Sequence, residues 1–256
     1  MYKKIFTAVF FSFLNVCFAQ GYQMQYSSSV PKQQTNEGKS YRVTYNLIMK
    51  IKQYDINTDI TTVLEGNKNK SVYVENFSKN TTTSSSAELI NIDANTFFYK
   101  DHLTKKIVYS DHIKFKFFVI EDEIKSFDWI LLPETKLISG YLCQKANCVF
   151  RGREYFVFFT KEIPTSDGPW KFGGLPGLIL EVFSDDAVAL YSINFKSIVY
   201  VDDSKIVDKF EGKKTVSYDE FKSMYNKRYQ QSLVDVVNDR GETRPMPKGF
   251  IEMLVD

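Results

Sequence analysis

An alternation of apolar and polar residues with a period of two restricts the fold of this chain more than any other feature. The first clear case runs from Tyr41 to Ile51, where apolar side chains occupy every second position and Arg42, Thr44 and Asn46 lie between them. Successive side chains of a β-strand point to opposite faces of the sheet, so the pattern produces one apolar and one polar face. This segment therefore predicts a strand in a sheet that is covered mainly on one side.

Further short segments of the same kind follow, with turn residues between them. They span residues 71–77, 97–99, 107–109, 113–120, 141–150, 154–160, 178–183 and 187–201. Arg151-Gly152-Arg153 connects two of these segments and predicts a hairpin. In the segment 113–120, we expect Ile113, Phe115, Phe117 and Val119 to share one face of a continuous strand.

One helix is predicted late in the chain. Ser217 and Glu220 have the spacing of a capping box, and apolar residues then recur at helical spacing. These apolar residues are Phe221, Met224, Tyr225 and Tyr229. Because helices do not alternate with the strands, a parallel α/β sheet is disfavoured. We predict a mainly β fold, namely a single curved antiparallel sheet, half-barrel-like, with one late C-terminal amphipathic helix; the pattern leaves open whether the sheet closes into a barrel.

The N-terminal 20 residues have the features of an export signal. Lys3 and Lys4 precede an apolar stretch from Ile5 to Leu14, and Ala19 occupies a small-residue cleavage position. The apolar stretch is shorter than the roughly 20 residues that a membrane-spanning helix needs. A lipid anchor on Cys17 is disfavoured, since the bulky Val16 precedes it.

These features predict three regions. Residues 1–19 are a signal peptide cleaved after Ala19, residues 20–40 a flexible polar lead-in, and residues 41–256 a single β domain in the periplasm or at the outer membrane. The mature chain is expected to contain no transmembrane segment, because no other run of 18 apolar residues occurs. Cleavage removes two of the 33 basic residues, so 31 basic residues face 31 acidic ones. This balance argues against nucleic acid as a partner.

The segment 163–180, IPTSDGPWKFGGLPGLIL, contains the densest cluster of turn residues. One interpretation is a compact loop, because glycine and proline are first of all turn signals. The other is a ligand-binding or partner-binding surface, because aromatic side chains beside rigid loops are typical of binding surfaces. The residues predicted for such a surface are Trp170, Phe172, Gly174, Leu175, Pro176 and Gly177.

The run from Gly174 to Ile179 resembles the signature of the GLPGLI family, a set of exported proteins of unknown function from Bacteroidetes-group bacteria. The resemblance extends from about Trp129 to Val182. Its context consists of Gly140-Tyr141-Leu142-Cys143-Gln144-Lys145-Ala146, Phe150-Arg151-Gly152-Arg153, Ile163-Pro164 and Gly168-Pro169-Trp170. The resemblance implies the exported single-domain organisation described above, and it implies no catalytic residue.

No catalytic site, metal site or cofactor is predicted. The chain lacks the G-x-S-x-G, P-loop and G-x-G-x-x-G motifs. His102 and His112 each follow an aspartate and are candidate metal ligands, but solvated turns explain both pairs better. Cys143 and Cys148 would lie about 17 Å apart on one strand, so we expect no disulfide unless the chain bends between them.

The leading functional hypothesis is a non-enzymatic, exported envelope protein that binds an apolar or peptidic ligand. It rests on the aromatic content of 16%, which exceeds what one modest core needs, and on the apolar concave surface that a curved sheet offers. The first alternative is a protein-docking accessory module for an outer-membrane transporter or an envelope assembly. The second is an undetected hydrolase, in which Asp111, His112 and a serine or cysteine would converge.

Overall fold

The computed structural model describes residues 39–52, 56–75, 96–125, 127–202, 205–234, 246–249 and 252–255. All of these residues belong to one compact unit, which spans residues 35–256. The predicted signal peptide lies outside the described residues. So does the predicted lead-in, apart from Lys39 and Ser40.

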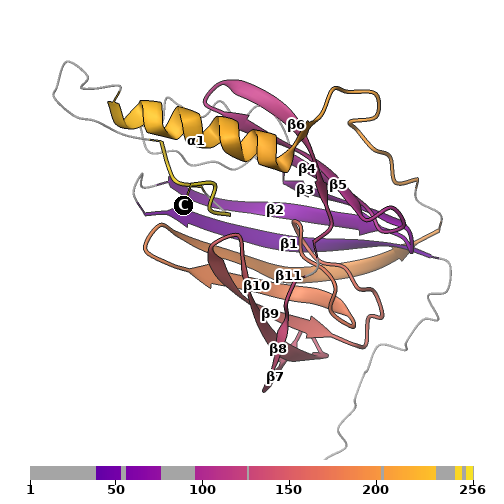
Figure 1. Cartoon of the computed structure of the whole chain (residues 1–256). Coiled ribbons are helices and arrows are strands. Elements are labelled where there is room, and N and C mark those ends of the chain that lie inside the picture. Colours follow the sequence, from indigo (N-terminus) through magenta and orange to yellow (C-terminus); the bar gives the residue numbers. More distant parts are fainter. Residues whose placement is uncertain are drawn as a thin grey trace, which may run out of the picture. The chain divides into compact units, whose positions relative to one another are not determined.

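The described residues form one sheet of twelve strands and one helix (Figure 1). The elements are β1 Ser40–Ile51, β2 Ile56–Gly66, β3 Lys70–Glu75, β4 Thr96–Asp101, β5 Lys106–Ile113, β6 Lys116–Glu123, β7 Ile130–Ile138, β8 Tyr141–Phe150, β9 Arg153–Thr160, β10 Leu178–Asp185, β11 Ala189–Val201, β12 Val216–Ser217 and α1 Tyr218–Val234. The strand order is β12-β6-β5-β4-β3-β2-β1-β11-β10-β9-β8-β7, so β12 and β7 are the two free edges and the sheet is not closed into a barrel. The predicted fold class is confirmed; all neighbouring strands are antiparallel except β12 and β6.

The alternation in β1 produces the expected covered face. Tyr41, Val43, Tyr45 and Leu47 are buried, whereas the residues between them are at least partly exposed. Val43 pairs with Leu64 of β2, and the same row of side chains continues across the sheet through Tyr73 of β3. One apolar face thus extends across several strands and forms the core.

The capping box predicted for α1 is present. The Ser217 hydroxyl accepts a hydrogen bond from the backbone N–H of Glu220 at 3.2 Å, and the Glu220 carboxylate accepts one from the backbone N–H of Ser217 at 2.8 Å. Phe221 and Tyr225 are buried, and the Phe221 ring packs edge-on against Phe118 of β6 at 5.7 Å. This apolar side holds α1 against the β6–β12 edge of the sheet.

Three strands were not predicted from the sequence, namely β2, β7 and the two-residue β12. In β2, Thr58 and Thr62 occupy buried positions, so the apolar alternation is weak; the Thr62 hydroxyl accepts a hydrogen bond from the Tyr73 hydroxyl at 2.9 Å. β7 is an edge strand that is exposed along most of its length and contains Pro133, and its pairing with β8 is irregular. Neither β2 nor β7 has, in its sequence, the regular apolar alternation by which strands are recognised.

The predicted continuous strand 113–120 is wrong. Ile113 ends β5 and pairs with Lys116, the first residue of β6, so Lys114 and Phe115 form a two-residue hairpin turn. Lys114 has a φ of 54°, which a strand does not allow. The chain reverses at this point, and the apolar residues on either side belong to different strands.

Two further expectations concern the cysteines and membrane-spanning segments. Cys143 and Cys148 lie on β8 as free, buried thiols. No helix in the described part of the chain is long and apolar enough to cross a membrane.

Candidate functional site

The segment 161–177 connects β9 to β10 and packs onto the covered face of the sheet. Trp170 is only 2% exposed, and its ring lies 4.9 Å from the Phe172 ring and 6.4 Å from the Phe98 ring of β4. The indole also contacts Tyr155 of β9. The structure therefore brings Trp170 and Phe172 together, as considered from the sequence, but places both in the core.

The other residues proposed for a binding surface divide into two groups. Leu175 and Gly177 are buried, whereas Gly174 and Pro176 are exposed. At Gly177 a side chain has no room, because a Cβ atom would lie 1.9 Å from the carbonyl oxygen of Thr160. This glycine allows the loop to pass directly beside the end of β9.

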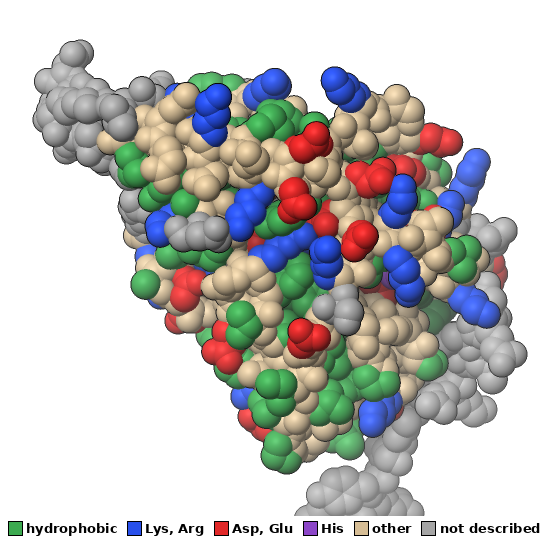
Figure 2. Space-filling view, in the orientation of Figure 1, with side chains coloured by type: hydrophobic (Ala, Val, Ile, Leu, Met, Phe, Trp, Pro, Cys, Tyr) green, Lys and Arg blue, Asp and Glu red, His purple; other side chains and the backbone are tan. Residues whose placement is uncertain are grey.

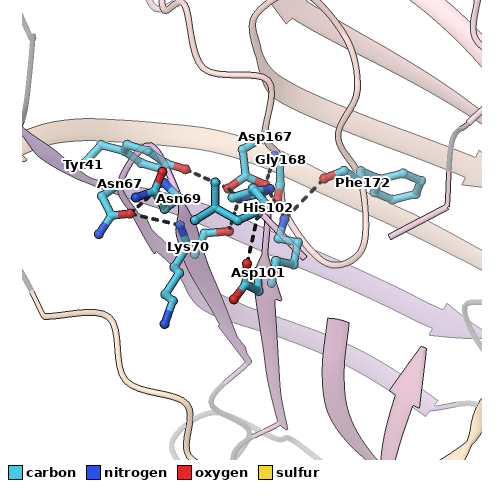
Figure 3. Close-up of polar contacts among 12 residues, drawn as sticks. Tyr41, Asn67, Asn69, Lys70, Asp101, His102, Asp167, Gly168 and Phe172 are labelled. Atoms are coloured by element: carbon cyan, nitrogen blue, oxygen red, sulfur yellow. Dashed lines mark hydrogen bonds and ion pairs between the residues drawn. The ribbon is translucent and has the colours of Figure 1, made fainter. Parts of the chain in front are cut away.

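A buried cluster of polar side chains holds this loop to the sheet (Figure 3). We call it the Asp167 cluster; it consists of Tyr41, Ser71, Lys100, His102 and Asp167. The Asp167 carboxylate accepts hydrogen bonds from the Tyr41 hydroxyl at 2.7 Å and from the backbone N–H of Gly168 at 2.8 Å. It also forms an ion pair with the ammonium of Lys100.

Lys100 comes from β4 and is 1% exposed. Besides Asp167, its ammonium donates hydrogen bonds to the carbonyl oxygens of Gly168 at 2.7 Å and Phe172 at 3.3 Å. All three donors of the ammonium are thereby used inside the loop. Burial opposes ionisation of Asp167, but Lys100 and His102 outweigh it and hold the pKa of Asp167 well below its usual range.

His102 joins the cluster to the surface, since 22% of its side chain is exposed. Its Nε2 lies 3.1 Å from the hydroxyl of Ser71 and 3.6 Å from the carboxylate of Asp167. Two tight turns position these residues: Asn67 accepts hydrogen bonds from two backbone N–H groups before Ser71, and Asp101 accepts two from residues after His102.

The combination of serine, histidine and aspartate is not a catalytic triad. In a triad, one ring nitrogen of the histidine faces the serine and the other faces the carboxylate. Here Ser71 and Asp167 both approach the same nitrogen of His102, and Ser71 is fully buried. Lys100 already compensates the charge of Asp167. The geometry is that of a structural support for the loop.

A second buried cluster holds the C-terminal residues. We call it the Glu252 cluster; it consists of Asp122, Arg151, Lys171 and Glu252. Glu252 accepts hydrogen bonds from Arg151 and Lys171, each at 2.7 Å, and Arg151 also binds Asp122 at 2.6 Å. The Arg151 guanidinium lies 3.3 Å from the centre of the Tyr218 ring. These contacts connect β6, the β8–β9 turn, the loop, α1 and the C-terminal residues.

Within the described residues, one buried carboxyl group has no charged partner of opposite sign. Glu75 of β3 is 3% exposed, and no hydrogen-bond partner for its Oε1 lies in this part of the chain. Burial, together with the nearby carboxyl group of Asp111, raises the pKa of Glu75 to about 8. Glu75 is therefore largely neutral at pH 7.

The histidines considered as metal ligands do not gather with other ligands. Across the described residues, no group of three histidine, cysteine, aspartate or glutamate side chains is placed to hold a metal ion. His102 belongs to the Asp167 cluster, a contact that the sequence did not reveal because its partners are about 30 and 65 residues away along the chain. His112 lies on β5, with its Nδ1 3.6 Å from the Asp111 carboxylate.

The structure thus defines an open β-sheet domain with a buried, ion-paired loop on its covered face. The family model described as "N-glycanase peptide, N-terminal domain" matches residues 43–221, and the chain belongs to this PNGase F-II N-terminal domain family. The resemblance to the GLPGLI family is therefore corrected: its six-residue signature matches, but the domain-length match is to the N-glycanase family.

Two structures of PNGF-II, in space groups C2 and P21, align with TM-scores of 0.48 and 0.49 and sequence identities of 16% and 15%. Each alignment covers 73% of this chain, but only 32% and 33% of the PNGF-II chains. This chain therefore spans about a third of the length of those proteins. A search of the curated proteins found no match.

The family match also corrects the functional hypotheses drawn from the sequence. An apolar or peptidic ligand, a transporter or envelope docking module, and a hydrolase built on Asp111 and His112 were considered. None of these hypotheses involved a glycan, whereas the family is named for an N-glycanase.

Proposed function

We propose that this chain is a non-catalytic recognition domain for N-linked glycans on proteins. The observation that carries the proposal is the family match over residues 43–221, which runs from β1 to the first turn of α1 and includes the loop and most of both buried clusters. We choose a glycan as the ligand because the family is named for an N-glycanase.

The chemistry of the described residues favours recognition over catalysis. Asp167 and Lys100 are buried and bind each other, and Glu252 is enclosed between Arg151 and Lys171. General acid–base catalysis needs a titratable group that reaches the substrate. These charged groups are instead used to hold the loop and the C-terminal residues, so contact with a ligand is left to exposed side chains.

Export is part of the same proposal. The predicted signal peptide 1–19, cleaved after Ala19, would deliver a single β domain of residues 41–256 to the periplasm or the outer membrane. Within this domain, we propose that the buried residues Trp170, Phe172, Leu175 and Gly177 fix the conformation of the loop. Of the six residues predicted for a binding surface, Gly174 and Pro176 are the two that are exposed.

Binding to matched glycoproteins tests the proposal. The chain from residue 20 onward is immobilised, and its affinity is measured by biolayer interferometry for an N-glycosylated protein and for the same protein after its glycans are removed. We expect saturable binding to the glycosylated form and at least a tenfold weaker affinity for the other. Equal binding to both forms, or binding to neither, would contradict recognition of the glycan.

A second measurement tests the non-catalytic part. The protein is incubated with an N-glycosylated peptide, and the peptide mass is followed by mass spectrometry. We expect the glycosylated mass to persist. Release of the glycan at a rate proportional to protein concentration would show that the chain is itself an enzyme.

A further inference from the structure

The tip of the β5–β6 hairpin exposes aromatic side chains that take no part in the core. Phe115 is 74% exposed and Phe117 is 58% exposed. Only one other phenylalanine in the described residues belongs to the exposed group, Phe183 at 45%. We call His112, Phe115 and Phe117 the aromatic tip.

The backbone holds the aromatic tip in a defined arrangement. Ile113 and Lys116 pair directly, so Phe115 sits in a two-residue turn. His112 and Phe117 face each other across the two strands, with ring centroids 5.9 Å apart. The tip is therefore a small, ordered surface on a paired hairpin.

Polar side chains of the same hairpin accompany these rings. His112, about one-third exposed, faces Phe117, and the exposed Lys114 occupies the turn beside Phe115. Lys114 adopts a φ of 54°, a conformation that glycine adopts without strain, yet a long cationic side chain stands there. Aromatic faces fringed by a few hydrogen-bonding groups match the chemistry of a sugar, whose C–H face packs on a ring and whose hydroxyls need donors and acceptors.

The exposed area of the aromatic tip favours a glycan over a protein partner. Two phenylalanines at these exposures offer on the order of 300 Å². A stable protein–protein interface buries about 800 Å² on each partner. A few sugar units fit the smaller area, whereas a folded protein would need further contacts beyond the aromatic tip.

We infer that the aromatic tip is the surface on which this domain binds the sugar units of an N-linked glycan. This inference rests on the proposed function and assigns it to named residues. Phe115 and Phe117 would stack on the sugar rings, and His112 and Lys114 would bind hydroxyl groups.

The chain offers a closely matched control for the test. Leu137 and Leu142 pair across the β7–β8 hairpin and are 71% and 57% exposed, nearly the same exposures as those of Phe115 and Phe117. Figure 2 shows apolar side chains gathered at the lower end of the molecule, where Figure 1 places β7 and β8. The two pairs thus differ in aromatic character and in position, but not in exposure.

The experiment compares Phe115→Ala/Phe117→Ala with Leu137→Ala/Leu142→Ala by biolayer interferometry against the N-glycosylated protein. We expect the phenylalanine variant to raise Kd at least tenfold and the leucine variant to leave Kd within twofold of the wild type. Phe115→Tyr/Phe117→Tyr keeps the rings and should retain binding. Circular dichroism and Tm establish that all variants are folded, and the released glycan, used as a soluble competitor, should displace the wild type.

Each contrary outcome has a separate meaning. If the wild type binds the glycosylated protein and the phenylalanine variant binds it equally well, the aromatic tip is not the binding site, although the proposed function still stands. Loss of binding in the leucine variant alone would place the site on β7–β8. If the phenylalanine variant loses the same affinity for the glycosylated and the deglycosylated protein, the aromatic tip binds the protein and not its glycan. Absence of wild-type binding would overturn both the proposed function and this inference.

Discussion

Glu75 and Asp167 are both buried carboxyl groups, but their surroundings give them opposite charge states. Asp167 has the ammonium of Lys100 and the ring of His102 beside it, so its pKa lies well below the usual range. Glu75 has a second carboxyl group, Asp111, as its charged neighbour, and burial raises its pKa to about 8. The unfavourable burial of a charge is therefore offset at Asp167 by an ion pair and avoided at Glu75 by protonation.

Glu75 makes the stability of the fold depend on pH. Its pKa is about 8 when folded and near the ordinary 4.5 when unfolded, so the folded state holds this proton more tightly. Stability from this group is complete below pH 4.5 and falls as the pH rises toward 8. We expect Glu75→Gln, which stays neutral, to be as stable as the wild type at pH 4.5 and more stable by on the order of 4 kcal/mol at pH 8.

Urea denaturation of both proteins at the two pH values measures this difference, and comparing the variants at each pH cancels the other titrating groups. A difference that is the same at pH 4.5 and pH 8 would show that folding does not raise the pKa of Glu75.

At the scale of elements, the buried ion pair between Asp167 and Lys100 joins the loop 161–177 to β4. Asp167→Asn would leave the buried ammonium of Lys100 without its counter-ion, which typically costs about 3–5 kcal/mol. We expect the unfolding free energy to fall by that amount, and the amide protons of Gly168 and Phe172 to exchange faster. Chemical denaturation and hydrogen exchange measure the two effects.

A double variant distinguishes the effect of an unpaired buried charge from the effect of losing the hydrogen bonds that hold the loop. Lys100→Met/Asp167→Leu removes both charges and leaves no unpaired ion, so it should be less destabilised than Asp167→Asn alone. Should the double variant instead be the less stable of the two, the hydrogen bonds from Lys100 to the loop carbonyls would matter more than the ion pair.

The elements also differ in how far their sequences predict them. β1 and the β8–β9 hairpin were predicted within one residue, because each has a clear apolar alternation or a glycine turn. β7 was missed because an exposed edge strand needs no apolar face. The β5–β6 turn was missed because Lys114 and Phe115 are not residues that typically form a two-residue hairpin turn.

At the scale of the whole molecule, noncovalent contacts between distant segments hold the described fold together. The ion pairs of the Glu252 cluster join four segments, and neither Cys143 nor Cys148 forms a disulfide. Burial raises the pKa of both thiols to about 12. The folded domain should therefore be insensitive to reductant and unreactive toward thiol reagents.

Ellman's reagent tests this expectation on the chain from residue 20 onward, which contains only these two cysteines. We expect no reaction in buffer within minutes, two thiols in guanidinium chloride, and a Tm that dithiothreitol does not change. Rapid reaction in buffer would mean that β8 opens readily, and a lower Tm with dithiothreitol would mean that a disulfide forms in solution.

The sequence by itself determined the class of fold, because strand alternation, turn residues and a capping box are local properties that operate over a few neighbouring residues. It also indicated a turn-rich segment at 163–180, and the structure has a loop at 161–177, between β9 and β10. Only the tertiary structure decided what that loop does. The partners of Asp167 come from residues 41, 100 and 102, and those of Lys171 and Arg151 from residue 252. Burial and charge pairing depend on which distant segments meet, and a pattern read along the chain does not contain that information.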